Sequence, residues 1–229
     1  MIYASVYCSP LGNITIVCNG THVLEAGFAT QECGLWKTAE LISQNEITSI
    51  NAKENVAADE ENNKRKQETG RNKAIQLLNK VFAWLDAYFA GEKPDPGKLP
   101  LAPQGSEFRK LVWQELLKIP YGKTETYGAI GKVVARKLHK EKMSAQAIGG
   151  AVGHNPVAVI IPCHRVVGSD GNLTGYAGGL DMKYKLLQHE HTDMTLLFWP
   201  KKKIKKAFVT GRYCLSRRPG LTEKCFSEN

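Results

Sequence analysis

Residues 149–167 read GGAVGHNPVAVIIPCHRVV, and this stretch holds the most informative pattern in the chain. The apolar run Val157–Ile161 predicts a buried strand or a buried coil, and Pro162-Cys163-His164-Arg165 follows it directly. A cysteine nucleophile reacts as the thiolate, and the neighbouring histidine can act as its base, directly or through a water molecule. Equally, Cys163 can be a small buried apolar residue and His164 a core histidine with satisfied hydrogen bonds.

The regions on both sides of this stretch predict helices. We expect helices over 106–119, 127–138, 145–152 and 181–190, the second and third capped by Thr126 and Ser144. Two helices separated by a short polar turn indicate a helix-turn-helix, although many helical hairpins bind nothing. Glu190 ends the last helix and is the candidate carboxylate to orient His164.

The N-terminal part predicts a small antiparallel sheet. Residues 2–8, 14–18 and 22–28 have strand patterns, and Asn19-Gly20 is typical of a two-residue hairpin turn. A polar insert around 37–72 predicts a mobile loop or a frayed helix, and a helix follows over 73–90.

These patterns together predict a two-domain fold. It consists of an α/β N-terminal domain over 1–100 and a mostly α-helical C-terminal domain over 106–200. The C-terminal domain carries the helix-turn-helix, which is winged-helix-like, and the active-site loop. The proline-rich stretch 91–105 is expected to link the two.

Composition narrows the class of protein. The chain has 229 residues and a formal net charge of +9, and no apolar run is long enough for a membrane span. The N-terminus lacks a signal-peptide pattern, so we expect a cytoplasmic protein, or a nuclear one in a eukaryote. The six cysteines form no CxxC pair and are expected to be free thiols.

The positive charge lies in the second half of the chain. Residues 101–190 hold 12 Lys and Arg against 7 Asp and Glu, and residues 201–229 hold 9 against 2. A basic region favours polyanions such as DNA, but it can also be a solvated surface. For the basic tail 201–229, an arm that contacts phosphates, an inert extension and a reading-frame accident all stay open.

The motifs around Cys163 resemble those of the O6-alkylguanine-DNA alkyltransferases, also called methylated-DNA–protein-cysteine methyltransferases. The resemblance rests on IPCHRVV at 161–167, on GHNP at 153–156, on TGYAGG at 174–179 and on KLLQHE at 185–190. Phe108, Trp113, the Pro120-Tyr121-Gly122 turn and Thr126-Tyr127 fit the same family, and Ser9-Pro10-Leu11-Gly12 suits its N-terminal domain. The resemblance is dense over 106–190 and weaker over 1–100.

The resemblance implies DNA repair by direct transfer of an alkyl group from O6-alkylguanine to Cys163, in a single turnover. It implies that His164, oriented by Glu190, acts through a water molecule as the base. Tyr127 would donate a proton toward guanine N3, and Asn155 would brace the site. Taken alone, Tyr127 also fits a packing residue and Asn155 an ordinary turn residue.

The resemblance also implies that the target guanine is flipped out of the duplex from the minor groove. The helix over 145–152 would enter the groove, since its small residues permit close approach or, equally, tight helix packing. The implied DNA-binding or substrate-binding residues are Gln146, Ala147, Gly149, Gly150, Pro162, Arg165, Val166, Tyr176 and Ala177. Arg165 is expected to be structural or to contact a phosphate.

Three further expectations concern DNA binding, metal binding and partners. Many family members carry arginine where this chain has Gln146, which predicts weaker binding and flipping. The spacing of Cys8, Cys18, Cys33 and His22 does not predict a metal site, and no cofactor is implied. We expect a monomer that binds double-stranded DNA containing O6-alkylguanine and no membrane.

Two other classes of function stay open. One is an alkyltransferase-like protein that recognises lesions without repairing them, although such relatives typically lack the cysteine. The other is a Cys-His hydrolase, which would need an oxyanion hole that nothing distinctive marks in this sequence.

Overall fold

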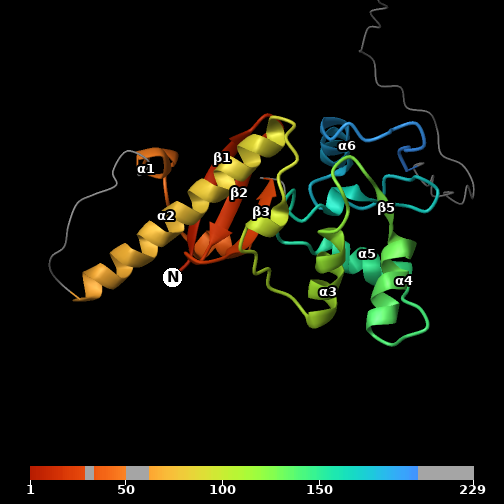
Figure 1. Ribbon diagram of the computed structural model, residues 1–229, viewed down its shortest axis with the longest axis horizontal. Helices are drawn as coiled ribbons and strands as arrows, with labels where there is room; N and C mark the ends of the chain where they lie inside the picture. The colour runs from red at the N-terminus through yellow and green to blue at the C-terminus, as the bar shows by residue number, and fades with distance from the viewer. Residues whose placement is uncertain (29–33, 50–61, 201–229) are drawn as a thin grey trace, which may run out of the picture.

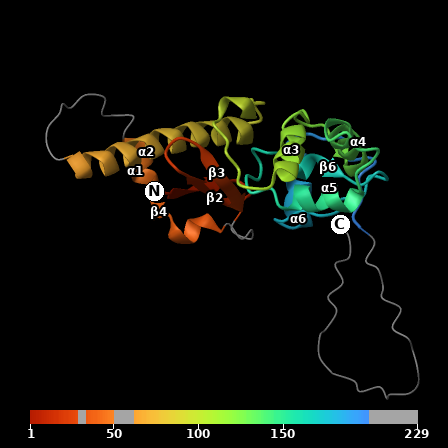
Figure 2. The ribbon, with the colours of Figure 1, turned by 90° about the horizontal axis from the view of Figure 1, so that it is seen from below.

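The computed structural model describes residues 1–28, 34–49 and 62–200, and it has two domains side by side (Figures 1 and 2). The tail 201–229 and the middle of the polar insert lie outside these residues. In the described part, no helix is both long and apolar enough to cross a bilayer. The combination of an α/β domain with a mostly helical domain confirms the predicted fold class. The exact domain boundaries remain a prediction.

The N-terminal domain is built on a four-stranded sheet. The strands are β1 (Tyr3–Ser9), β2 (Gly12–Cys18), β3 (Val23–Phe28) and β4 (Glu40–Leu41), in the order β3-β2-β1-β4. The first three pair antiparallel, and β4 is parallel to β1. Alternate residues such as Ile14 and Ile16 are fully buried, as the period-two pattern predicts.

The connection between β2 and β3 differs from the predicted two-residue turn. It spans residues 19–22, with the Asn19 side chain accepting hydrogen bonds from the backbone nitrogens of Thr21 and His22. Gly20 has a φ of +90°, which a side chain would disfavour. The Asn-Gly pair therefore marks the turn correctly, but the asparagine side chain closes a longer loop than expected.

The described part of the polar insert is more structured than the sequence indicates. It contains a 3-10 helix (Leu35–Thr38), β4 and the short helix α1 (Gln44–Ser49). Helix α2 runs from Asn62 to Phe89, so it begins eleven residues before the predicted start at 73. Its buried face, which includes Leu78, Val81 and Leu85, packs against the sheet (Figure 1). The polar early turns hid this helix because they lack the apolar spacing on which the prediction relied.

The C-terminal domain consists of four helices and a two-stranded parallel pair. The helices are α3 (Glu107–Leu116), α4 (Tyr127–Lys137), α5 (Ala145–Gly153) and α6 (Leu180–His189). Ser106, Thr126 and Ser144 each accept a backbone hydrogen bond at the N-terminus of α3, α4 and α5, as predicted for the last two. Strands β5 (Glu125–Thr126) and β6 (Val166–Val167) pair beside them.

The edge strand β3 joins the two domains through its backbone. Val23 accepts a bond from Ala102 in the segment that leads to α3, and its own nitrogen donates to Pro100. Further along β3, Ala26 exchanges backbone bonds with Pro156 and Ala158. The run Val157–Ile161 is thus a buried coil bound to a sheet edge, and this contact places the start of the Cys163 loop at the domain junction.

Candidate active site

The loop that leads to Cys163 is tightly turned. The Ile160 nitrogen donates to the Ala158 carbonyl at 2.9 Å, across Val159, whose φ is +69°. The Cys163 nitrogen donates to the Ile161 carbonyl at 2.8 Å, across Pro162 at φ −81° and ψ 62°. Each is a three-residue turn, and a positive φ at a β-branched valine is a strained conformation that the surrounding core must hold. The chain then enters the 3-10 helix η4 (Cys163–Arg165).

Cys163 is nearly enclosed, with 5% of its surface exposed. Asn155 lies beside it, and its Nδ2 is 3.1 Å from the sulfur. The same amide donates to the Ile161 carbonyl at 2.8 Å, while Oδ1 accepts from the Val157 nitrogen at 3.1 Å. Asn155 therefore contacts both the loop and the sulfur, and these contacts are compatible with the bracing role expected of it.

Two opposing effects act on the thiol. Burial raises the pKa of Cys163, while the hydrogen bond from Asn155 and the charge of Lys183 lower it. The sulfur therefore depends on these two groups and on a nearby base to ionise at neutral pH.

His164 and Glu190 form a fully buried pair. The Nε2 atom of His164 lies 2.7 Å from Oε1 of Glu190, although the residues are 26 positions apart. Burial, with smaller contributions from the charges of Arg165 and Lys183, lowers the pKa of His164 in spite of Glu190, which favours a neutral ring at pH 7. A neutral ring that donates from Nε2 carries its lone pair on Nδ1. That atom has no hydrogen-bond partner among the described residues, and it is the free base of the pair.

Arg165 narrows one expectation. Its guanidinium is buried and donates to both oxygens of Glu190, at 2.8 and 2.9 Å, and to the Ile119 carbonyl at 2.6 Å. A side chain held in this way is committed to Glu190 and Ile119, which favours the structural one of the two roles expected for Arg165 over the phosphate contact. Burial opposes ionisation of Glu190, but the bonds from His164 and Arg165 hold its pKa well below the usual range.

Lys183 is a functional candidate that the sequence analysis missed. It lies on α6, is fully buried, and donates to the carbonyls of Val166 at 2.5 Å and Thr174 at 2.8 Å. Burial lowers its pKa to about 8. From the sequence KYKLL, Lys183 was expected only to be a lysine on a helix. The signal that could have singled it out is that it lies on the same side of the helix as the buried apolar residues.

Tyr127 and the 174–179 loop lie on the other side of the site. The Tyr127 hydroxyl, at the start of α4, donates to the Thr174 carbonyl at 3.0 Å. Burial raises its pKa, so it stays protonated. Tyr176 is half-buried, its hydroxyl has no partner among the described residues, and Ala177 is exposed. The structure thus holds Tyr127 against the loop, and its contact with guanine stays a prediction.

The residues predicted to enter the groove lie on α5. Gln146 and Gly150 are exposed, and Ala147 and Gly149 are partly exposed, so this side of α5 is open to a ligand. Pro162 and Val166 are buried instead, and the Val166 carbonyl already accepts from Lys183.

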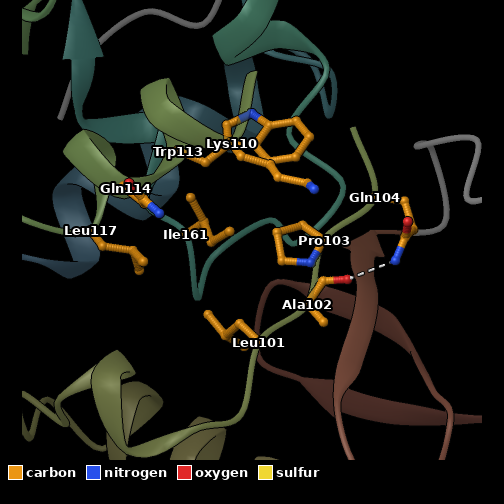
Figure 3. A pocket seen from close by; sticks show the side chains of 9 residues that line it. All are labelled: Leu101, Ala102, Pro103, Gln104, Lys110, Trp113, Gln114, Leu117 and Ile161. Atoms are coloured by element: carbon orange, nitrogen blue, oxygen red, sulfur yellow. Dashed lines mark hydrogen bonds between the residues drawn. The ribbon is translucent and has the colours of Figure 1, made fainter. Parts of the chain in front are cut away.

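A separate cavity of about 320 Å³ lies at the domain junction (Figure 3). It lies between α3, which contributes Trp113 and Gln114, and the segment Leu101–Gln104, and Ile161 also lines it. No residue predicted for catalysis lines it, so it is distinct from the Cys163 site.

The two domains match two models of the same family. Residues 2–103 match the 6-O-methylguanine DNA methyltransferase, ribonuclease-like domain, and residues 107–192 match the 6-O-methylguanine DNA methyltransferase, DNA binding domain.

Curated relatives and solved structures agree with these models. A methylated-DNA–protein-cysteine methyltransferase of Methanosarcina acetivorans is 50% identical over 115 residues, which cover 50% of this chain and 70% of the relative. One of Mycolicibacterium paratuberculosis is 46% identical over 116 residues, covering 49% and 67%. The crystal structure of the Mycobacterium tuberculosis O6-methylguanine methyltransferase has a TM-score of 0.57 at 30% identity, covering 83% of this chain and 93% of that one. The structure of Mycobacterium tuberculosis OGT in complex with DNA gives 0.60 at 30% identity, covering 82% and 92%.

Proposed function

Because the chain belongs to the 6-O-methylguanine DNA methyltransferase family, and so repairs DNA by alkyl transfer to a cysteine, we propose that Cys163 is the acceptor. The substrate is O6-alkylguanine in double-stranded DNA, and each molecule reacts once. One observation carries the assignment. Cys163 is next to a buried, neutral histidine whose far nitrogen is held by Glu190, and its sulfur receives a hydrogen bond from Asn155.

The reaction is a displacement at the alkyl carbon. The Cys163 sulfur forms a bond to that carbon as the bond from carbon to O6 breaks. The thiol proton leaves toward Nδ1 of His164 through a water molecule, and the departing guanine takes a proton at N3 from Tyr127. Tyr127 must exchange its bond to the Thr174 carbonyl for this one, which a rotation of its hydroxyl permits.

The product explains the single turnover. An alkylated cysteine is a thioether, which has no carbonyl for water to attack, so no hydrolysis regenerates the thiol. A Cys-His hydrolase instead passes through a thioester and turns over. Stoichiometry therefore separates these two classes of function.

Access to the base requires flipping, because O6 of a paired guanine lies inside the duplex. Helix α5 supports entry from the minor groove, since the small residues Ala147, Gly149 and Gly150 lie on its open side and let the backbone come close. Gln146 on the same helix would occupy the gap left by the flipped base.

The test is intact-protein mass spectrometry after mixing the protein with a duplex that contains one O6-methylguanine. We expect a gain of one methyl group, about 14 Da, mapped to the Cys163 peptide and equal to at most one per molecule. Cys163→Ala should show no gain, while Cys8→Ala, which removes an exposed cysteine, should react normally. Lesion-selective binding without any mass gain would replace this proposal with the recognition-only function.

A further inference from the structure

The Glu190 carboxylate receives a hydrogen bond from the other domain. Tyr88, near the end of α2, donates its hydroxyl to Oε1 of Glu190 at 2.8 Å, across 102 positions of sequence. Oε1 is the same atom that accepts from His164, at 2.7 Å, and from Nη2 of Arg165, at 2.9 Å. Three donors thus share one oxygen, and only Tyr88 belongs to the N-terminal domain.

The ring of Tyr88 is held in place from several sides. It stacks on Trp84 at 5.6 Å and meets the rings of Phe89, Tyr121 and His189 at 5.0 to 5.8 Å. Its backbone carbonyl also lies 2.9 Å from Nε2 of His189, the residue before Glu190. The end of α2 and the end of α6 therefore meet at this point, and Tyr88 is only 1% exposed.

Tyr88 is a permanent donor. Burial, and then the negative charge of Glu190, raise the pKa of its hydroxyl, so it stays protonated wherever the protein is folded. The Tyr88 hydroxyl therefore donates the same hydrogen bond to the Glu190 carboxylate, and stabilises its negative charge to the same extent, at every pH.

We propose that Tyr88 is a positioning residue of the N-terminal domain for the reaction at Cys163, acting through Glu190 on His164. The proposal rests on the function proposed above. Tyr88 fixes Oε1 and shares its negative charge, and this sets how strongly Glu190 holds His164. The N-terminal domain is thereby part of the base that activates the thiol, and not only a scaffold.

Removal of the hydroxyl has a defined direction. In Tyr88→Phe the ring packing is kept, but Glu190 loses one donor and its charge is less shared. Glu190 then attracts the protonated ring of His164 more strongly, and the acid limb of the transfer rate moves to higher pH. The substitution leaves the other charged and titratable groups around the His164–Glu190 pair in place. Around Glu190 these are Arg165, Tyr121 and the Gly122 nitrogen, and near His164 they are Cys163 and Lys183.

The matched control is Tyr7→Phe. Like Tyr88, Tyr7 donates its hydroxyl to a carboxylate, in this case Oδ1 of Asp86 on α2, at 2.7 Å. This bond joins β1 to α2 and lies outside the network around Cys163. The two variants therefore remove the same kind of bond, one inside the network and one outside it.

Two measurements test the proposal. The first is the proton NMR resonance of the His164 Nε2–H group, assigned with His164→Gln, and it needs no DNA. In Tyr88→Phe we expect it to move downfield as its bond to Glu190 shortens, while Tyr7→Phe leaves it in place. The second is the single-turnover transfer rate across about pH 5.5 to 9, where the acid limb of Tyr88→Phe should lie about half a unit higher, so that its rate is lower by up to about threefold on that limb and close to wild type above it.

An unmoved Nε2–H resonance, together with a rate profile that only scales, would overturn the proposal and leave Tyr88 with a structural role. If the wild-type protein transfers no methyl group, the function proposed above fails. The NMR comparison still decides whether Tyr88 acts on His164, so the two failures are distinct.

Discussion

The side-chain nitrogen of Asn155 lies 3.1 Å from the sulfur of Cys163 and directs its N–H toward it. Asn155 follows α5, the helix proposed to enter the DNA groove, so groove binding and the state of the thiol share one short segment. The same amide holds the Ile161 carbonyl, which keeps the loop and the sulfur in register.

Asn155→Ala should slow methyl transfer by about tenfold to a hundredfold. A hydrogen bond to a charged group contributes about 1.5–3 kcal/mol, and its loss raises the pKa of the Cys163 thiol. The measurement is the single-turnover rate on a duplex containing O6-methylguanine. His154→Ala, at the exposed neighbouring position, is the control, and equal rates for the two variants would contradict the role given to Asn155.

Glu190→Gln should destabilise the protein by about 3–5 kcal/mol at pH 7, because it leaves the Arg165 guanidinium buried without its charge partner. The pKa of Glu190 is depressed in the folded state, against about 4.3 when unfolded. The unfolded chain therefore binds the proton first, so this stabilisation is present above about pH 4.3 and is lost as the pH falls below it.

Urea unfolding at several pH values tests this. The acid loss of stability should be smaller in Glu190→Gln than in the wild type. Glu107→Gln, which changes a 91% exposed carboxylate, should keep the wild-type pH dependence. An unchanged slope in Glu190→Gln would show that other carboxylates set the acid limit.

Lys183→Met should slow transfer by more than about tenfold. The substitution keeps the length of the side chain but removes the bonds to the Val166 and Thr174 carbonyls and the positive charge that lowers the pKa of Cys163. Transfer rate and thermal unfolding should both be measured. Lys185→Met is the control on the exposed side of α6, and a similar loss in that variant would mean a general effect of charge on DNA binding.

The same lysine gives a basic limit to the reaction. Its pKa of about 8 means that the folded protein loses this charge as the pH rises through 8. Ionisation of the Cys163 thiol alone would make the transfer rate rise with pH. Because Lys183 loses its charge, we expect the transfer rate above about pH 8 to be lower than this rise predicts. A rate that keeps rising to pH 10 would exclude a role for the Lys183 charge.

Gln146→Arg should strengthen duplex binding by roughly fivefold and speed transfer, because a cation is added on the exposed side of α5. Fluorescence anisotropy at two salt concentrations, with the transfer rate, measures both effects. Gln114→Arg adds the same charge on α3 and controls for net charge. Unchanged affinity and rate in Gln146→Arg would show that Gln146 does not occupy the gap left by the base.

The sequence predicted the elements whose signals are local. The caps Thr126 and Ser144 gave the starts of α4 and α5 to the residue, since a cap depends on side chains within three positions. For the long polar start of α2 the sequence left a mobile loop or a frayed helix open, because the stability of this start comes from the part that packs on the sheet and from continuity of the helix, not from its own apolar spacing.

The candidate site divides in the same way. The pairing of Cys163 with His164, and the proposal that a thiol acts here, follow from adjacent residues and from motif order, so the sequence by itself determined them. The commitment of Arg165 to Glu190, the buried amine of Lys183 and the bond from Tyr88 were decided only by the tertiary structure. The physical reason is that these contacts join residues 9 to 102 positions apart, which only the packing of the chain brings together. The bond from Tyr88 also requires the two domains to meet at the Glu190 carboxylate.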